Sequence, residues 1–158
     1  MMDSPKTTEM LMPAELLTPA DHAVVARAVD AARRLTIPGI QEVGAAVRTG
    51  DGQIFAAIHF ESATGFATVC GEVAALSLMI AAGRRDVELV AAVWLDQDGV
   101  VYVLPPCGRC RELIADCNPA ARVIVSRDDD HWQPQASTAL VTLPIADLLP
   151  RKSHRLRG

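Results

Sequence analysis

Residues 105–113 read PPCGRCREL, and this short stretch contains both a strand end and two candidate metal ligands. The two prolines end the apolar run 100–104, because proline has no amide hydrogen for a strand ladder. From Cys107 onward the sequence predicts a helix, which the Asn-Pro pair at 118–119 ends. Cys107 and Cys110 are therefore expected at the start of a helix that directly follows a strand.

The segments on either side alternate between helices and strands. Thr18 followed by proline and an acid predicts a helix start, and 69–82 is apolar almost all round, as in a buried helix. The predicted order is α-ββ-α-ββ-α-β-α, with helices at 18–35, 69–82, 107–117 and 144–149 and strands at 43–47, 54–60, 89–95, 100–104 and 122–126. This alternation predicts an α/β sandwich with helices on both faces of a sheet.

The composition excludes several classes of protein. The chain has 158 residues, half of them hydrophobic and 22% charged, which is typical of a globular protein with a real core. A net charge of −4 offers no basic patch for long nucleic acids, and no apolar run reaches membrane-spanning length. We expect one domain over 18–150, with a partly ordered extension at 1–17 and a basic tail at 151–158. The N-terminus lacks a secretion signal and the cysteines are few, so a cytoplasmic location is expected.

A third cysteine lies at the other predicted helix start. Residues 68–76 read TVCGEVAAL, so Cys70 and Glu72 open the apolar helix. Helix N-termini favour thiolate, the form that binds metal, and two facing helix starts would bring three thiolates around one ion. Three protein ligands are typical of a catalytic zinc that keeps a position for water and supplies hydroxide at neutral pH. Glu72 would then move the water proton to a leaving nitrogen.

Other interpretations of these residues stay open from the sequence. Cys107 and Cys110 also match a redox dithiol, and a structural zinc site would need Cys117 as its fourth ligand. Glu72 could act only as a carboxylate in the first turn of its helix.

The paired motifs resemble one family of enzymes. The signature of zinc nucleobase deaminases is His-x-Glu followed by Pro-Cys-x-x-Cys, with a three-cysteine variant, and this chain resembles that variant in Cys70-Gly71-Glu72 and in 106–110. Over roughly 20–150 the chain resembles the small cytidine deaminases, and in PCGRCR and in length it is similar to blasticidin-S deaminase. The stretches that carry this likeness are VGAAVRTGDGQIF, HFESATGFATVCGE and PPCGRCRELI. The resemblance implies a three-layer sandwich with a mixed five-stranded sheet, and a homotetramer or dimer.

The resemblance also implies a role for each matching residue. Zn²⁺ would be held by three ligands, with Glu72 as the proton shuttle of a zinc hydroxide that attacks the amino-bearing carbon. Arg111 would hydrogen-bond a ligand sulfur and offset thiolate charge, and Glu61 would bind the sugar hydroxyls of a nucleoside. The three implied zinc ligands are Cys70, Cys107 and Cys110.

Several residues depart from the family pattern near the expected substrate. His59 stands where the family has asparagine, and Gln41, Ser62 and Gly65 also differ. Glu61 has the alternative of an exposed charge at a strand end, and His59 that of a structural histidine. We therefore expect hydrolytic deamination of a nucleoside or a related amino-heterocycle, with altered specificity. The alternatives are a blasticidin-S-type aminonucleoside deaminase and a non-catalytic nucleoside-binding protein on the same scaffold.

Overall fold

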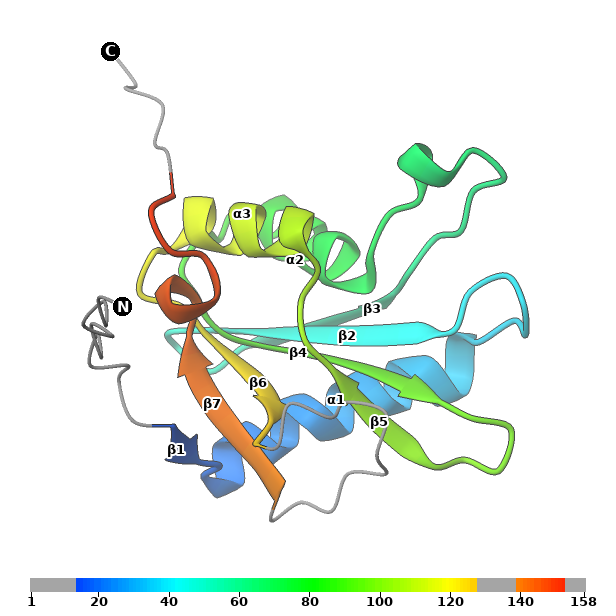
Figure 1. The fold of residues 1–158 in the computed structure, drawn as a ribbon, viewed down its shortest axis with the longest axis horizontal. Coiled ribbons are helices and arrows are strands. Elements are labelled where there is room, and N and C mark those ends of the chain that lie inside the picture. The colour runs from blue at the N-terminus through cyan, green and yellow to red at the C-terminus, as the bar shows by residue number, and fades with distance from the viewer. Residues whose placement is uncertain (1–13, 128–138, 153–158) are drawn as a thin grey trace, which may run out of the picture.

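A computed structural model describes residues 14–127 and 139–152, in which a mixed sheet lies between helices (Figure 1). The predicted order of helices and strands is confirmed over residues 18–126, whereas a short strand precedes it and a strand with a 3₁₀ turn replaces the predicted last helix. In chain order the elements are β1 (Glu15–Leu16), α1 (Pro19–Leu35), β2 (Val43–Thr49), β3 (Ile54–Ile58), the 3₁₀ turn η1 (Gly65–Ala67), α2 (Gly71–Ala81), β4 (Val87–Leu95), β5 (Val101–Leu104), α3 (Gly108–Cys117), β6 (Arg122–Ser126), β7 (Leu140–Pro144) and the 3₁₀ turn η3 (Ile145–Leu148).

The sheet has seven strands in the described residues, so the expectation of five strands was wrong. Its order is β1-β7-β6-β4-β2-β3, with β5 paired to β4 beside this path. Only the β4–β6 pair is parallel; the other pairs are antiparallel. β6 pairs with Leu89 and Val90, whereas β5 pairs with β4 from Ala92 onward. The neighbour of β4 therefore changes halfway along the strand, close to where α3 begins.

The C-terminal part of the domain differs most from the prediction. A helix was expected at 144–149, but the chain forms β7 and then only the short turn η3. The apolar run of β7 is buried against β6, and four residues are too few for a stable α-helix. β1 lies within the predicted extension 1–17 and pairs with β7. The rest of that extension, 1–13, and tail residues 153–158 lie outside the described residues.

Helix α1 covers one face of the sheet, and α2 and α3 cover the other (Figure 1). The predicted start of α1 is confirmed by a reciprocal capping box, in which Asp21 and Thr18 bond each other's backbone N–H. Gly44 in β2 allows α1 to lie close, because a Cβ there would be 2.7 Å from the Ala32 nitrogen. None of the described helices is both long and apolar enough to cross a membrane.

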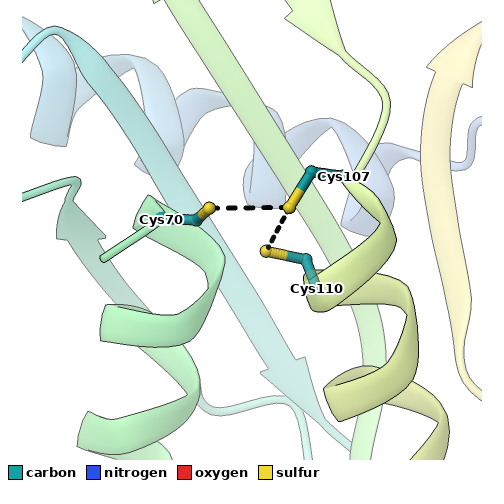
Figure 2. A group of neighbouring side chains, drawn as sticks. All are labelled: Cys70, Cys107 and Cys110. Carbon is teal, nitrogen blue, oxygen red and sulfur yellow. Dashed lines mark hydrogen bonds between the residues drawn. The ribbon is translucent and has the colours of Figure 1, made fainter. Parts of the chain in front are cut away.

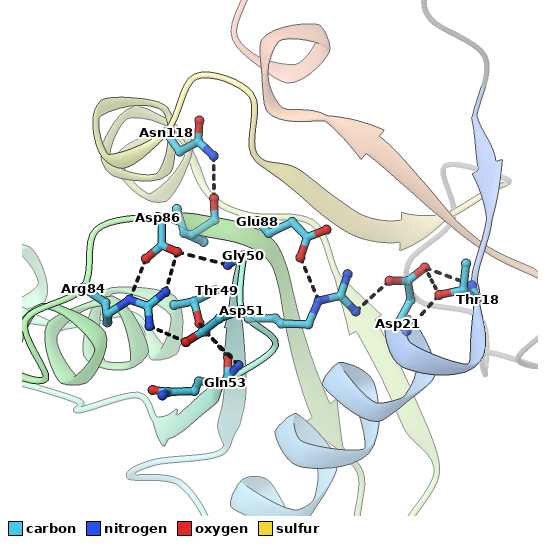
Figure 3. A network of polar contacts seen from close by, with 12 residues as sticks. Thr18, Asp21, Thr49, Gly50, Asp51, Gln53, Arg84, Asp86, Glu88 and Asn118 are labelled. Atoms are coloured by element: carbon cyan, nitrogen blue, oxygen red, sulfur yellow. Dashed lines mark hydrogen bonds and ion pairs between the residues drawn. The ribbon is translucent and has the colours of Figure 1, made fainter.

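A polar network ties the β2–β3 turn to the start of β4 (Figure 3). Arg84 bonds both Asp51 of the turn and Asp86 before β4. The hydrogen bond from Arg84 lowers the pKa of Asp51 to about 2. Arg48 of β2 pairs with Asp21 of α1 at 2.9 Å, which joins the first helix to the same edge of the fold.

Candidate metal centre and active site

The structure brings the three predicted cysteine ligands together (Figure 2). The sulfur atom of Cys107 lies 3.6 Å from that of Cys70 and 3.5 Å from that of Cys110. All three sulfur atoms lie within 4.8 Å of one another. Residues 37 positions apart in the sequence therefore meet because α2 and α3 start side by side on one face of the sheet.

The first residues of α2 and α3 allow the three sulfur atoms to lie close together. Cys70 and Cys107 are the N-cap residues of α2 and α3, where free backbone N–H groups favour a negative sulfur. Gly71 is needed for close approach, because a Cβ there would be 2.8 Å from the Val43 carbonyl oxygen. The sequence Cys-Gly-Glu thus places the first turn of α2 directly against β2.

The donor set and its spacing fit a zinc ion. A tetrahedral zinc with zinc–sulfur bonds of about 2.3 Å holds its sulfurs about 3.8 Å apart, close to the two distances above. Within the described chain the cluster contains three ligands, and Cys117 is not among them. All four cysteines are free, and sulfurs 3.5 Å apart are not disulfide-bonded. The geometry therefore favours an open, three-ligand zinc site over a structural four-ligand site or a redox dithiol.

The three thiols have different pKa values. Burial raises the pKa of Cys110, and the negative charge of Glu72 raises it further. Burial also raises the pKa of Cys70. For Cys107 burial acts in the same direction, but hydrogen bonds from Cys110 outweigh it and lower the pKa. Three adjacent thiolates need a cation to be stable together, which is further support for a metal at this position.

Glu72 lies in the first turn of α2 and is only 5% exposed. Burial raises the pKa of its carboxyl group above the ordinary value of 4.5, although nearby hydrogen bonds act against this. A carboxyl group with a raised pKa accepts and returns protons readily near neutral pH. The carboxyl group also accepts a hydrogen bond from its own backbone N–H in this first turn, as the alternative of a helix-capping carboxylate expects.

A pocket of about 280 Å³ opens onto the cysteine cluster. It lies at the place where the neighbour of β4 changes, which is a common position for binding sites in α/β sheets. Glu61 and Glu72 both line this pocket. The lining residues are Val43, His59, Glu61, Thr68, Cys70, Gly71, Glu72, Ala92, Leu104, Pro105 and Cys107.

His59 and Glu61 follow β3 and form one wall of this pocket. The His59 Nδ1 accepts hydrogen bonds from the backbone N–H groups of Glu42 and Val43, at 3.0 and 2.9 Å. The imidazole proton of neutral His59 is therefore on Nε2, which faces the Glu61 carboxylate at 3.4 Å. The other Glu61 oxygen accepts from the Thr68 hydroxyl at 2.9 Å. The structure thus places both residues together and adds Thr68, which the sequence did not single out.

Arg111 does not occupy the predicted position beside a sulfur. Its guanidinium donates to the backbone carbonyls of Pro106, at 2.7 Å, and Leu148, at 3.1 Å. Arg109 instead lies 3.4 Å from the Cys70 sulfur. Residues two positions apart in an α-helix are rotated by about 200° around its axis, so Arg109 and Arg111 point to nearly opposite sides of α3. Arg111 holds the loop before Cys107, and Arg109 contacts the cluster.

Of the four departures from the family pattern, only His59 lines the pocket in the described residues. Gln41 donates its side-chain amide to the Leu35 carbonyl at 2.8 Å and closes the turn after α1. Ser62 accepts from the Thr64 backbone within the loop that carries η1, and Gly65 begins that turn. Within the described residues His59 is therefore the departure that can alter the wall of this pocket directly.

Comparisons with known proteins agree with this site. Residues 18–127 match the family model described as the cytidine and deoxycytidylate deaminase zinc-binding region. The chain is 36% identical over 117 residues to blasticidin-S deaminase from Bacillus cereus, covering 72% of this chain and 77% of the relative. It is 38% identical over 79 residues to a cytidine deaminase from Halalkalibacterium halodurans, covering 50% of this chain and 57% of that protein.

Solved structures show the same fold. The cytidine deaminase from Burkholderia pseudomallei superimposes with a TM-score of 0.64 at 26% identity, covering 85% of this chain and 98% of the other. The cytidine deaminase from Mycobacterium leprae gives a TM-score of 0.61 at 25% identity, covering 82% and 97%.

Proposed function

The chain belongs to the cytidine and deoxycytidylate deaminase family, and from that premise we propose that it hydrolyses the exocyclic amino group of a cytidine-type nucleoside or a related amino-heterocycle, releasing ammonia. One observation carries this proposal: a cluster of three thiols borders, through Cys70 and Cys107, the same pocket that the buried carboxylate of Glu72 lines. A metal-activated water and a proton shuttle are the two parts that hydrolytic deamination needs.

We propose that Cys70, Cys107 and Cys110 hold the zinc of this family's site. When bound there, zinc acts as a Lewis acid and lowers the pKa of water to near neutrality. Three protein ligands would leave one coordination position of such an ion for water. Arg111 supports this site at a distance, because its bonds to the Pro106 and Leu148 carbonyls hold the chain just before Cys107.

The proposed role of Glu72 is to move both protons of the attacking water in turn. Its carboxylate takes the first proton from the water and passes it to the ring nitrogen, and then takes the remaining hydroxyl proton and delivers it to the amino group, which leaves as ammonia. Oxygen is thereby added to the ring carbon as the carbon–nitrogen bond breaks, so the reaction needs only water. The burial of Glu72 supports this role, because bulk solvent does not compete for the transferred proton.

We propose that Glu61 and His59 orient the substrate. Each Glu61 oxygen is already held by one donor, Thr68 or His59, and each keeps accepting capacity for a ligand. A carboxylate placed in this way suits the hydroxyl donors of a sugar. Glu61 is 46% exposed, so it lies at the rim of the pocket, whereas Glu72 lies at its buried end.

The charge of the pocket favours a nucleoside over a nucleotide. In the described residues its lining contains two carboxylates and no lysine or arginine. A phosphate group would meet negative charge without a cation to pair with, which disfavours binding.

A blasticidin-S-type aminonucleoside is the second candidate substrate. Its support is the 36% identity to the blasticidin-S deaminase of Bacillus cereus. The rim carboxylate Glu61 would also attract a positively charged substituent on such a nucleoside.

The deciding experiment measures ammonia release from the zinc-loaded protein across matched substrates. We expect turnover of cytidine, deoxycytidine or a blasticidin-type nucleoside, and much weaker turnover of the corresponding monophosphates. Equal turnover of the monophosphates would refute the argument from pocket charge. Tight binding of a nucleoside without any ammonia would favour the non-catalytic binding protein.

We also propose that the protein is a cytoplasmic homo-oligomer. The four free cysteines suit a reducing compartment. Helix α2 is apolar almost all round, yet Leu78 and Ile80 are 48% and 44% exposed, which suits a second copy packed against it. Sedimentation should therefore show an oligomer, and Leu78→Glu combined with Ile80→Glu should yield monomers. A wild-type monomer at micromolar concentration would contradict this proposal.

A further inference from the structure

Arg109 joins the two halves of the active site. It lies between Cys107 and Cys110 in the first turn of α3, and its Nη2 atom has two partners. One is the Cys70 sulfur at 3.4 Å, and the other is the backbone carbonyl of Thr68 at 2.5 Å. A side chain of α3 thus holds the loop that leads into α2.

A chain of hydrogen bonds continues from Thr68 into the pocket wall. The Thr68 hydroxyl donates to one Glu61 oxygen at 2.9 Å, and His59 faces the other oxygen at 3.4 Å. The Thr68 hydroxyl also accepts from the Ser62 backbone at 3.2 Å. The position of Glu61 therefore depends on Thr68, whose carbonyl is bonded to Arg109.

The loop that carries Glu61 has few other anchors. Its base is closed by the backbone bridge between Phe60 and Val69, and its middle is the short turn η1. Phe66 in that turn is 88% exposed, and Figure 1 shows the segment extending away from the sheet. A loop of this kind opens easily unless side chains hold it.

We propose that Arg109 is a positioning residue that couples the zinc-binding cysteines to the substrate-binding carboxylate Glu61 through Thr68. Three thiolates and one Zn²⁺ carry a net charge of −1, which draws the guanidinium to Cys70. The Arg109 Nη2 atom also donates to the Thr68 carbonyl, and the Thr68 hydroxyl in turn donates to the Glu61 carboxylate and holds it in place. The substrate part of this inference rests on the proposed function, whereas the link between cluster and loop does not.

The test compares Arg109→Gln with Arg33→Gln, which removes the same charge from an exposed position on α1, across the sheet from the site. Zinc affinity is measured by chelator competition, loop opening by hydrogen exchange over residues 60–69, and KM and kcat with the best substrate found above. For Arg109→Gln we expect zinc affinity to fall by about 10–100-fold, exchange of the loop to accelerate, and KM to rise more than kcat falls. Arg33→Gln should match wild type in all three.

Two further variants separate the charge effect from the loop effect. Arg109→Lys keeps a positive charge but lacks the planar guanidinium. Its zinc affinity should therefore be closer to wild type than that of Arg109→Gln, whereas hydrogen exchange of residues 60–69 should stay as fast as in Arg109→Gln. Thr68→Val removes the hydroxyl and should raise KM while zinc affinity stays at the wild-type value. In the Arg109→Gln/Thr68→Val double variant the rise in KM should be less than additive.

Wild-type exchange of residues 60–69 in Arg109→Gln would overturn the proposal, as would fully additive effects on KM. Zinc affinity and hydrogen exchange can both be measured without any catalytic turnover. If no nucleoside is deaminated, the proposed function fails, and the coupling of cluster and loop is still decided by these two measurements.

Discussion

Replacing Glu72 by glutamine tests the proposed chemistry most directly. The amide has the same shape as the carboxylate, so the pocket wall and the start of α2 should be preserved. It cannot accept a proton from water, however, and general acid–base groups contribute about 10²–10⁴-fold to rate. At 1.36 kcal/mol per factor of ten, this corresponds to about 2.7–5.4 kcal/mol of transition-state stabilisation.

Zinc content and stability should not fall in Glu72→Gln, because Glu72 is not in the cysteine cluster. Burial of an ionised carboxylate at 5% exposure opposes folding, so a neutral amide should leave the melting temperature equal or higher. The three assays are ammonia release, zinc content of the purified protein, and thermal unfolding. Glu88→Gln, which changes an exposed carboxylate outside the pocket lining, is the matched control.

Two results would refute this reasoning. Turnover at the wild-type rate in Glu72→Gln would remove Glu72 from the mechanism. Loss of zinc or a lower melting temperature would instead assign Glu72 a structural role.

Three further predictions concern packing, pH and the metal. Gly44→Ala should lower the free energy of unfolding by about 1–3 kcal/mol in urea, because its Cβ would collide with α1; Gly65→Ala, with open space around it, should change little. Asp51 has a lowered pKa of about 2 against an ordinary 3.8, so its contribution is complete above pH 3.8 and is lost as pH falls towards 2. The difference in melting temperature between wild type and Asp51→Asn should therefore disappear over that range. Metal analysis should find about one zinc per chain, and Cys110→Ser should lose it; a folded, metal-free wild type would exclude the zinc site.

The predictions from sequence succeeded where a local signal was strong. The start of α1 follows from the Thr18–Asp21 capping pair, whose partners are three residues apart. The break before Cys107 follows from two prolines that cannot continue a strand. The position of each cysteine motif at the start of its own helix also follows from local features, whereas the packing of α2 beside α3 brings the three sulfur atoms together.

The predictions failed where pairing over a long distance decides the structure. β7 is stable because it pairs with β6 on one side and with β1 on the other, although β1 is more than 120 residues away in the sequence. A short apolar run such as 140–144 has no helical or strand period that identifies it by itself. The sheet therefore has seven strands where local patterns indicated five.

The sequence alone indicated the candidate donor atoms, the carboxylate proposed as the shuttle and the alternation of helices and strands, because each depends on residue type and short spacing. Only the tertiary structure decided which arginine contacts a sulfur and which groups hold Glu61. Arg109 and Arg111 both adjoin Cys110 in the sequence, yet helix rotation separates their side chains. Packing of α3 against the loop then brings Arg109 to Cys70 and Thr68, contacts across about 40 residues that no local pattern specifies.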